Sequence, residues 1–178
     1  MSQDTVKIYK WFWPDQDEQQ EQWLRARASE GLHLHKPATF CGWTFKKGEA
    51  ADVAYRIDYQ TSRSPLYRDL FEDAGWQCVG ESFGWHYWRK AVVNGKAEEI
   101  FTDNASKIDK YRRVLIMLAV GIMPLTVLMI TSGPHNFLLN LSPVSRVLFS
   151  AVIVLGYPIY AYAAVRLYKR IKTLRRSA

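Results

Sequence analysis

The side chains of this chain that could do chemistry begin with His33 and His35, which stand two positions apart. Residues i and i+2 of a strand point to the same face, so the pair could hold a metal ion. His86, Cys41 and Cys78 are the side chains that could complete such a site. No second closely spaced pair of ligands follows, and the alternative is two solvated histidines on an exposed strand. We therefore expect no metal and no cofactor, and keep His33 and His35 as weak metal candidates.

Sequence motifs for catalysis are missing. The chain has no glycine-rich phosphate loop, no nucleophile elbow, no zinc-protease helix and no cysteine–histidine pair at informative spacing. Asp58 and Glu81 are carboxylates without a catalytic partner nearby in sequence. This pattern points away from an enzyme. The alternative is a membrane-tethered, metal-assisted enzyme with His33 and His35 as ligands.

Aromatic residues are concentrated in the first half of the chain, where all seven tryptophans lie between residues 11 and 88. One interpretation is a small core held together by large rings. The other is a cleft for a small apolar or cationic ligand, which tryptophan faces would bind by stacking and cation–π contact. The candidate ligand-binding residues for such a cleft are Trp11, Trp43, Tyr55, Trp85 and Trp88.

The elements that must position these side chains follow one order twice, strand–helix–strand–strand, over residues 1–90. Pro14 and acidic residues open the first helix region, Ser64 and Pro65 open the second, and a glycine ends each. We predict an α+β domain with one antiparallel sheet and two helices on one face. Duplicated modules of this kind occur in gyrase-inhibitor-like drug-binding domains, an analogy of fold alone. The predicted strands are 6–13, 32–34, 41–47, 53–60, 76–81 and 85–90, and the predicted helices are 15–30 and 64–74.

Two runs further along carry no Asp, Glu, Lys or Arg: residues 114–131 and 147–165. About 20 apolar residues are needed to cross a bilayer, and each run reaches that length with a flanking turn. We predict a transmembrane hairpin made of these two runs. A connector and basic stalk helix (91–113) precedes the hairpin, and a basic tail (166–178) follows it.

Basic residues flank the two runs on one side only, since the connecting loop carries Arg146 alone. The positive-inside rule then places both termini in the cytoplasm of a multi-pass inner-membrane protein. The chain has 13 basic and 16 acidic residues through residue 105, but 11 basic and one acidic residue after it. The expected partner of this basicity is anionic lipid rather than nucleic acid. The predicted lipid-contacting residues are Lys107, Lys110, Arg112, Arg113, Arg166, Lys169 and Arg170.

Several short motifs, in order, carry a resemblance to a known family: Lys7-Ile8-Tyr9-Lys10-Trp11-Phe12, Trp23-Leu24 before Glu30-Gly31-Leu32, Tyr55-Arg56-Ile57-Asp58, Phe71-Glu72-Asp73-Ala74-Gly75-Trp76 and Tyr87-Trp88-Arg89-Lys90. Over residues 5–110 the chain resembles an uncharacterised bacterial membrane-protein family with an N-terminal domain of unknown function (domain of unknown function 2812). Members are often encoded near regulators of the PadR type, so the resemblance implies membrane-associated sensing or regulation. It supplies no catalytic residues.

Together these patterns predict an inner-membrane-anchored, non-enzymatic cytoplasmic sensing or adaptor protein that binds a protein partner or a small amphipathic ligand. The alternatives are the tethered enzyme above and an accessory subunit of a transporter. The space between the predicted helices and the sheet separates two versions of the leading prediction. A filled interior favours a protein adaptor, and an open aromatic cleft favours small-molecule sensing.

Overall fold

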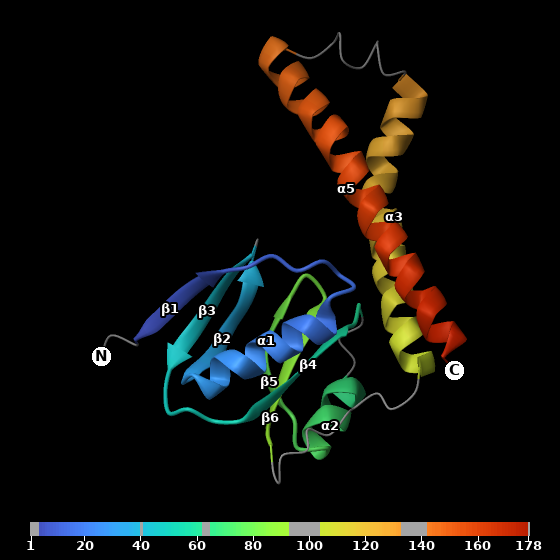
Figure 1. The fold of residues 1–178 in the computed structure, drawn as a ribbon. Coiled ribbons are helices and arrows are strands. Elements are labelled where there is room, and N and C mark those ends of the chain that lie inside the picture. Colours follow the sequence, from blue (N-terminus) through green and yellow to red (C-terminus); the bar gives the residue numbers. More distant parts are fainter. Residues whose placement is uncertain (1–3, 40, 62–64, 93–103, 133–141, 178) are drawn as a thin grey trace. The chain divides into compact units, whose positions relative to one another are not determined.

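The computed structural model describes residues 4–39, 41–61, 65–92, 104–132 and 142–177. The chain divides into two compact units, Met1–Lys110 and Tyr111–Ala178, and each is described by itself (Figure 1). We call them the soluble unit and the helical unit. Residues 93–103 of the predicted connector and stalk helix (91–113) lie outside the described residues.

The first half of the soluble unit is built from β1 (Thr5–Tyr9), α1 (Asp17–Ser29), β2 (Leu32–Thr39) and β3 (Gly42–Lys47). Its strands form an antiparallel sheet in the order β1-β3-β2. β1 ends earlier than predicted because a turn precedes α1, in which the Trp13 amide donates to the Gln16 side chain at 2.9 Å. β2 is longer than predicted and includes two register shifts.

The second half repeats this order with β4 (Val53–Tyr59), α2 (Pro65–Asp73), β5 (Gln77–Ser82) and β6 (Trp85–Ala91). Its strands form a second antiparallel sheet in the order β4-β6-β5. The predicted repeat and the α+β class are confirmed, but the single sheet is wrong. The two sheets meet where β2 runs beside β5. At this seam the Pro37 ring lies against Gly80, and Ser82 Oγ donates to the Ala38 carbonyl at 2.9 Å.

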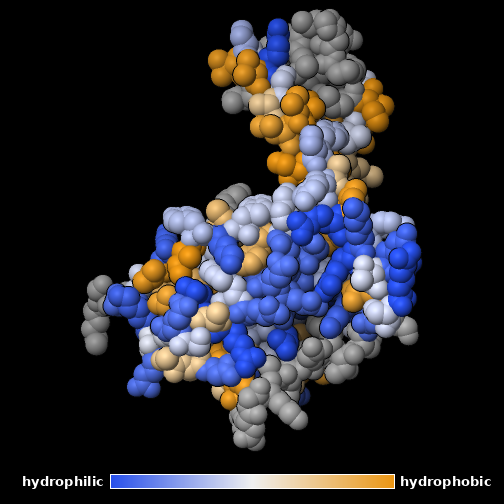
Figure 2. Space-filling view, viewed as in Figure 1, coloured by the Kyte–Doolittle hydropathy of each residue, from blue (hydrophilic) through white to orange (hydrophobic). Residues whose placement is uncertain are grey.

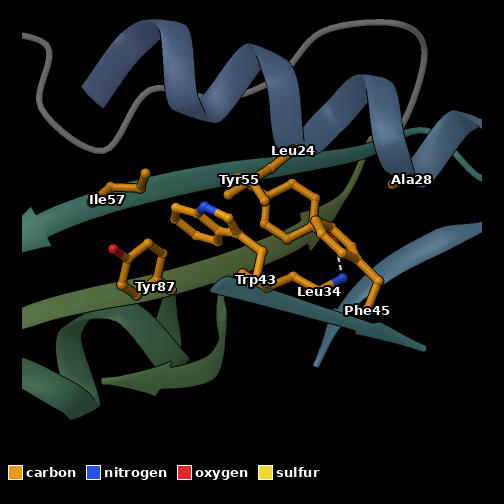
Figure 3. Packing of buried hydrophobic residues seen from close by; sticks show 8 residues of the cluster. All are labelled: Leu24, Ala28, Leu34, Trp43, Phe45, Tyr55, Ile57 and Tyr87. Carbon is orange, nitrogen blue, oxygen red and sulfur yellow. Dashed lines mark hydrogen bonds between the residues drawn. The ribbon is translucent and has the colours of Figure 1, made fainter. Parts of the chain in front are cut away.

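The larger hydrophobic core lies under α1 and joins the two halves. Leu24 and Ala28 of α1 are fully buried among side chains of both sheets (Figure 3). Burying a leucine of this kind stabilises the fold by roughly 1.5–3 kcal/mol. The first helix therefore packs on the second half as well as on its own. The buried members of this core are Leu24, Ala28, Leu34, Trp43, Phe45, Tyr55, Ile57 and Tyr87.

A smaller core lies under α2 and uses the alternate residues of the same strands. Phe71 of α2 stacks on Trp88 with ring centroids 4.3 Å apart, and Ala54 and Trp76 complete the cluster. Successive residues of a strand point to opposite faces, so α1 and α2 cover opposite faces of the second sheet. The prediction that both helices lie on one face is wrong. Helix α1 crosses from its own sheet onto the inner face of β4, which leaves the other face for α2.

The helical unit contains most of α3 (Asn104–Ser132) and all of α5 (Pro143–Arg176). Among the described residues, α5 is the one helix long and apolar enough to cross a membrane, and few of its apolar residues are buried. The other predicted run, 114–131, is helical as part of α3. Figure 2 shows apolar side chains in orange over this unit. Most of the loop between the runs, residues 133–141, lies outside the described residues.

Candidate functional site: a charged cavity at the edge of β4

The candidate site lies along β4, which is an edge strand of the second sheet. An edge strand presents backbone N–H and C=O groups that need other partners. At Ile57 these groups are bound by charged side chains. The Ile57 amide donates to Glu21 Oε1 at 2.9 Å, and the Ile57 carbonyl accepts from Lys110 Nζ at 3.3 Å. Glu21 comes from α1 and Lys110 from the first turns of α3, so two helices cover the edge of this strand.

Ion pairs extend this cover on both sides. Lys110 donates to Asp17 of α1, and both side chains are almost fully buried. Arg56 Nη1 lies 3.2 Å from Glu21 Oε2 and also donates to the Tyr55 carbonyl at 2.9 Å. A buried ion pair is stable only when its remaining donors and acceptors are bound as well. Three of the four side chains that pair here, Glu21, Arg56 and Lys110, also bind backbone groups of β4.

A cavity of about 400 Å³ lies among these groups, within the soluble unit. Its charged side chains come from α1, β4 and the start of α3, while apolar atoms of β4 and α2 form the rest of the wall. It is the size of a small-ligand site. The lining residues are Asp17, Glu18, Glu21, Gln22, Arg25, Ala54, Tyr55, Arg56, Ile57, Asp58, Phe71, Lys107 and Lys110.

Glu21 is a titratable group whose pKa is shifted by its place in this cavity. Burial raises its pKa from 4.5 to about 7, and nearby Asp17 adds to the rise. Arg56, the Ile57 amide and Lys110 act in the opposite direction, with Arg56 the strongest of these. Burial dominates because it disfavours the charged form of the carboxylate. Glu21 can therefore gain or lose a proton near neutral pH.

A second polar row crosses the same sheet on the α2 side. Asp58, His86 and Glu81 lie opposite one another on three neighbouring strands, because His86 pairs in register with both carboxylates. Tyr67 donates to Asp58 Oδ2 at 2.9 Å, and His86 Nδ1 lies 3.4 Å from Glu81 Oε1. Asp58 and Glu81 thus have a shared neighbour that spacing along the chain did not show. Period-two alternation combined with a correct strand register would have found it.

The five aromatic residues predicted to bind a ligand are not gathered around one opening. Trp43 and Tyr55 belong to the larger core, against which Trp85 packs, and Trp88 is buried in the smaller core. Trp11 is 60% exposed and meets Trp13 edge to face. Tyr55 is the member of this set that lines the charged cavity. The aromatic rings fill the interior of the soluble unit, and ligand binding by the set stays a prediction.

The two candidate metal ligands, His33 and His35, border a second, more open cavity of about 620 Å³. His33 Nε2 is hydrogen-bonded to the Glu49 carbonyl at 2.7 Å. Among the described residues, no group of three His, Cys, Asp or Glu side chains is arranged to hold a metal ion. Cys41 and Cys78 are free thiols.

The predicted lipid-contacting residues separate into two groups. Lys107 and Lys110 line the charged cavity, and Lys110 is 5% exposed, so the structure places it in a protein contact. Arg166 lies over the Tyr162 ring at 5.7 Å. Arg112 and Lys169 are exposed on the helical unit, Arg113 and Arg170 are half-buried, and lipid contact by all of these stays a prediction. Sequence reasoning missed Asp17, Glu21 and Arg56 as site residues, because charged residues on a helix and an edge strand are usually solvated.

Comparison with known proteins identifies the class of this chain. Residues 16–123 match the sequence model of a family described as a protein of unknown function (DUF2812). The chain belongs to this family. The match begins at the turn before α1, includes every residue of the charged cavity and extends into α3. No curated protein and no solved structure matches the chain.

Proposed function

We propose that this protein is a membrane-anchored, non-enzymatic sensing or adaptor protein. Its soluble unit binds a small ligand or a protein partner at the charged cavity, and α3 carries the resulting change toward the membrane. The observation that carries the proposal is the position of Lys110. This residue belongs to the soluble unit, is paired with Asp17, and lies in the same helix as the apolar run 114–131.

Membrane anchoring is supported by the surface of the helical unit. The exposed apolar residues of α3 include Ile116, Val120, Met123, Val127 and Ile130, which repeat every three or four positions. That spacing forms one continuous stripe along a helix. A large exposed apolar surface marks a membrane or protein contact.

A hairpin of two spans is supported by contacts between α3 and α5. Thr126 Oγ1 and Tyr157 Oη lie 3.0 Å apart, and Gly121 lies beside the Tyr160 hydroxyl. Between these two contacts the residue number falls along α3 and rises along α5, as expected for antiparallel helices. Small residues and hydroxyl contacts of this kind hold helices together in lipid. We propose that both helices span the inner membrane and that both termini are cytoplasmic, on the basic-residue asymmetry given above.

By the criterion given above, the filled aromatic interior favours a protein adaptor over an aromatic ligand cleft. That criterion did not include the charged cavity, which is where we expect either kind of partner to bind. Its polar groups are held together by ion pairs that a ligand or partner would have to exchange. Because Lys110 is one of these groups, exchange at the cavity changes what holds the first turns of α3. No step in this proposal requires catalysis.

Fractionation and labelling of the full chain test the anchoring. We expect the protein to remain in the membrane pellet after alkaline carbonate washing. In a background with Cys41→Ser and Cys78→Ser, single cysteines introduced as D4C and S177C should react with a membrane-impermeant maleimide after cells are opened. Reaction in intact cells, or a protein recovered in the soluble fraction, would overturn the proposal.

A further inference from the structure

The charged cavity is lined by equal numbers of carboxylates and basic side chains. Among the described lining residues are four carboxylates, Asp17, Glu18, Glu21 and Asp58, and four basic side chains, Arg25, Arg56, Lys107 and Lys110. Arg25 is already bound by both oxygens of Asp52, at 2.6 and 2.7 Å, and Asp52 is not part of the lining. Glu18 is exposed, so the carboxylates that the protein covers are Asp17, Glu21 and Asp58, and the further cations are Arg56, Lys107 and Lys110.

At Glu21, burial of the carboxylate outweighs this pairing. Its side chain is 14% exposed, and the cation nearest to it, Arg56, also binds the Tyr55 carbonyl. Lys110 is directed to Asp17 and to the Ile57 carbonyl. Burial then raises the pKa of Glu21 to about 7, so near neutrality this carboxylate can bind a proton.

The remaining walls indicate which kind of cation could replace that proton. Ala54, Tyr55, Ile57 and Phe71 line the same cavity as the carboxylates. Apolar and aromatic atoms beside an anionic group favour an organic cation over a hydrated inorganic one. A volume of about 400 Å³ accommodates a molecule larger than a single ammonium ion.

We propose that the charged cavity binds a small monovalent organic cation, a primary or quaternary amine with an apolar or aromatic body, whose charge lies against Glu21. Binding exchanges one cation for the proton on Glu21, which leaves for the solvent, so the net charge of the cavity is unchanged. This proposal rests on the proposed function and names the ligand class of its site. The same cation lies within the network that holds Lys110, which connects binding to α3.

Titration calorimetry on the full chain in a neutral maltoside detergent tests the proposal with benzylammonium chloride as the probe. Benzyl alcohol has a similar shape without charge, and benzoate reverses the charge. We expect saturable binding of benzylammonium near pH 8 and none of the other two. The heat should depend on the ionisation enthalpy of the buffer near pH 7, because a proton is released. Well below that pH the affinity should fall about tenfold per pH unit, since one proton competes with the cation.

Two variants distinguish binding of the probe at the charged cavity from its adsorption to the detergent micelle. Glu21→Gln should weaken benzylammonium binding at least tenfold, whereas Glu30→Gln, at the C-cap of the same helix and outside the lining, should leave it unchanged. Tryptophan fluorescence melting confirms that both variants fold. The proposal is overturned if benzyl alcohol binds equally well, if Glu21→Gln binds benzylammonium as tightly as the unaltered chain, or if neither benzylammonium nor tetramethylammonium saturates. None of these outcomes bears on membrane anchoring, which fractionation tests separately.

Discussion

The two halves of the soluble unit share one topology, but their first strands differ in how much of the strand is covered. Both follow the order strand–helix–strand–strand, with sheet orders β1-β3-β2 and β4-β6-β5. In β1, side chains alternate between exposed and half-buried. In β4, both faces are covered, and charged side chains from α1 and α3 bind its outer edge at Ile57.

This difference arises from the position of α1. The helix belongs to the first half by sequence, yet its buried side chains pack on β4 and β6 of the second half. Its polar side then faces the edge of β4, where Asp17 and Glu21 become cavity residues. The repeat therefore supplies the scaffold, and the loss of symmetry between the halves supplies the site.

Removing Lys110 should show the largest difference in stability between the buried ion pair beside β4 and an exposed ion pair in the first half. Lys110→Met leaves Asp17 buried without its cation and should lower the free energy of unfolding by about 3–5 kcal/mol. The control is Lys47→Met in β3, whose pair with Asp4 is exposed and should change stability by less than about 1 kcal/mol. Urea titration followed by tryptophan fluorescence measures this, because all seven tryptophans lie in the soluble unit. Equal losses of unfolding free energy in the two variants would contradict the difference between the buried and the exposed pair. Adding Asp17→Asn to Lys110→Met should restore part of the lost stability.

Truncation of Leu24 tests whether α1 stabilises both halves. This side chain is fully buried, and Leu24→Ala should cost about 2–5 kcal/mol through lost burial and a cavity. On the corresponding helix α2, Leu70 is 65% exposed, and Leu70→Ala should change stability by less than about 0.5 kcal/mol. The same fluorescence titration applies. Hydrogen exchange should show faster opening of β4 as well as β3 in Leu24→Ala, and an effect confined to the first half would contradict the shared core.

The glycines that end the two helices provide the closest match between the halves. Gly31 and Gly75 both have φ +79°, where an alanine costs about 1–2 kcal/mol. A Cβ on Gly31 would also lie 2.6 Å from the Gly48 carbonyl oxygen, whereas one on Gly75 would lie 3.5 Å from the flexible end of Lys90. Gly31→Ala should therefore lower stability by about 2–4 kcal/mol, and Gly75→Ala by the strain alone. Thermal melting of the two variants measures the difference between their losses of stability. Identical losses would show that the two turns are equivalent.

Replacing Glu21 should give the smallest effect on stability, and one that depends on pH. The folded pKa of Glu21, about 7, lies above its ordinary value of 4.5, so the folded state binds more protons between these values. Stability should fall as pH rises through this window, and Glu21→Gln should remove that fall. The variant should be more stable than the unaltered chain near pH 8 by on the order of 1–3 kcal/mol, and similar below pH 4.5. Glu30→Gln should follow the unaltered chain, and a Glu21→Gln curve that also follows it would mean that Glu21 stays ionised.

Much of the fold could be predicted because it depends on local patterns. Alternation in β4, the proline that opens α2 and the glycines after both helices place most elements within a few residues of their observed ends. The site could not be predicted in this way. Glu21, Arg56 and Lys110 are ordinary surface types in sequence, and they become a site only when α1, β4 and α3 meet. The role of the aromatic residues could not be predicted for a different reason, since large rings are equally suited to a cleft and to a core.

The sequence by itself determined the repeated strand–helix–strand–strand order, the charge-free runs and the family to which the chain belongs. These follow from residue spacing, hydropathy and short motifs, which act over a few neighbouring positions. Only the tertiary structure decided that α1 lies across both halves, that α2 takes the opposite face, and that a carboxylate on α1 is buried beside an edge strand. Those outcomes depend on which surfaces of distant segments exclude water together, and the burial that raises the pKa of Glu21 exists only after they have packed.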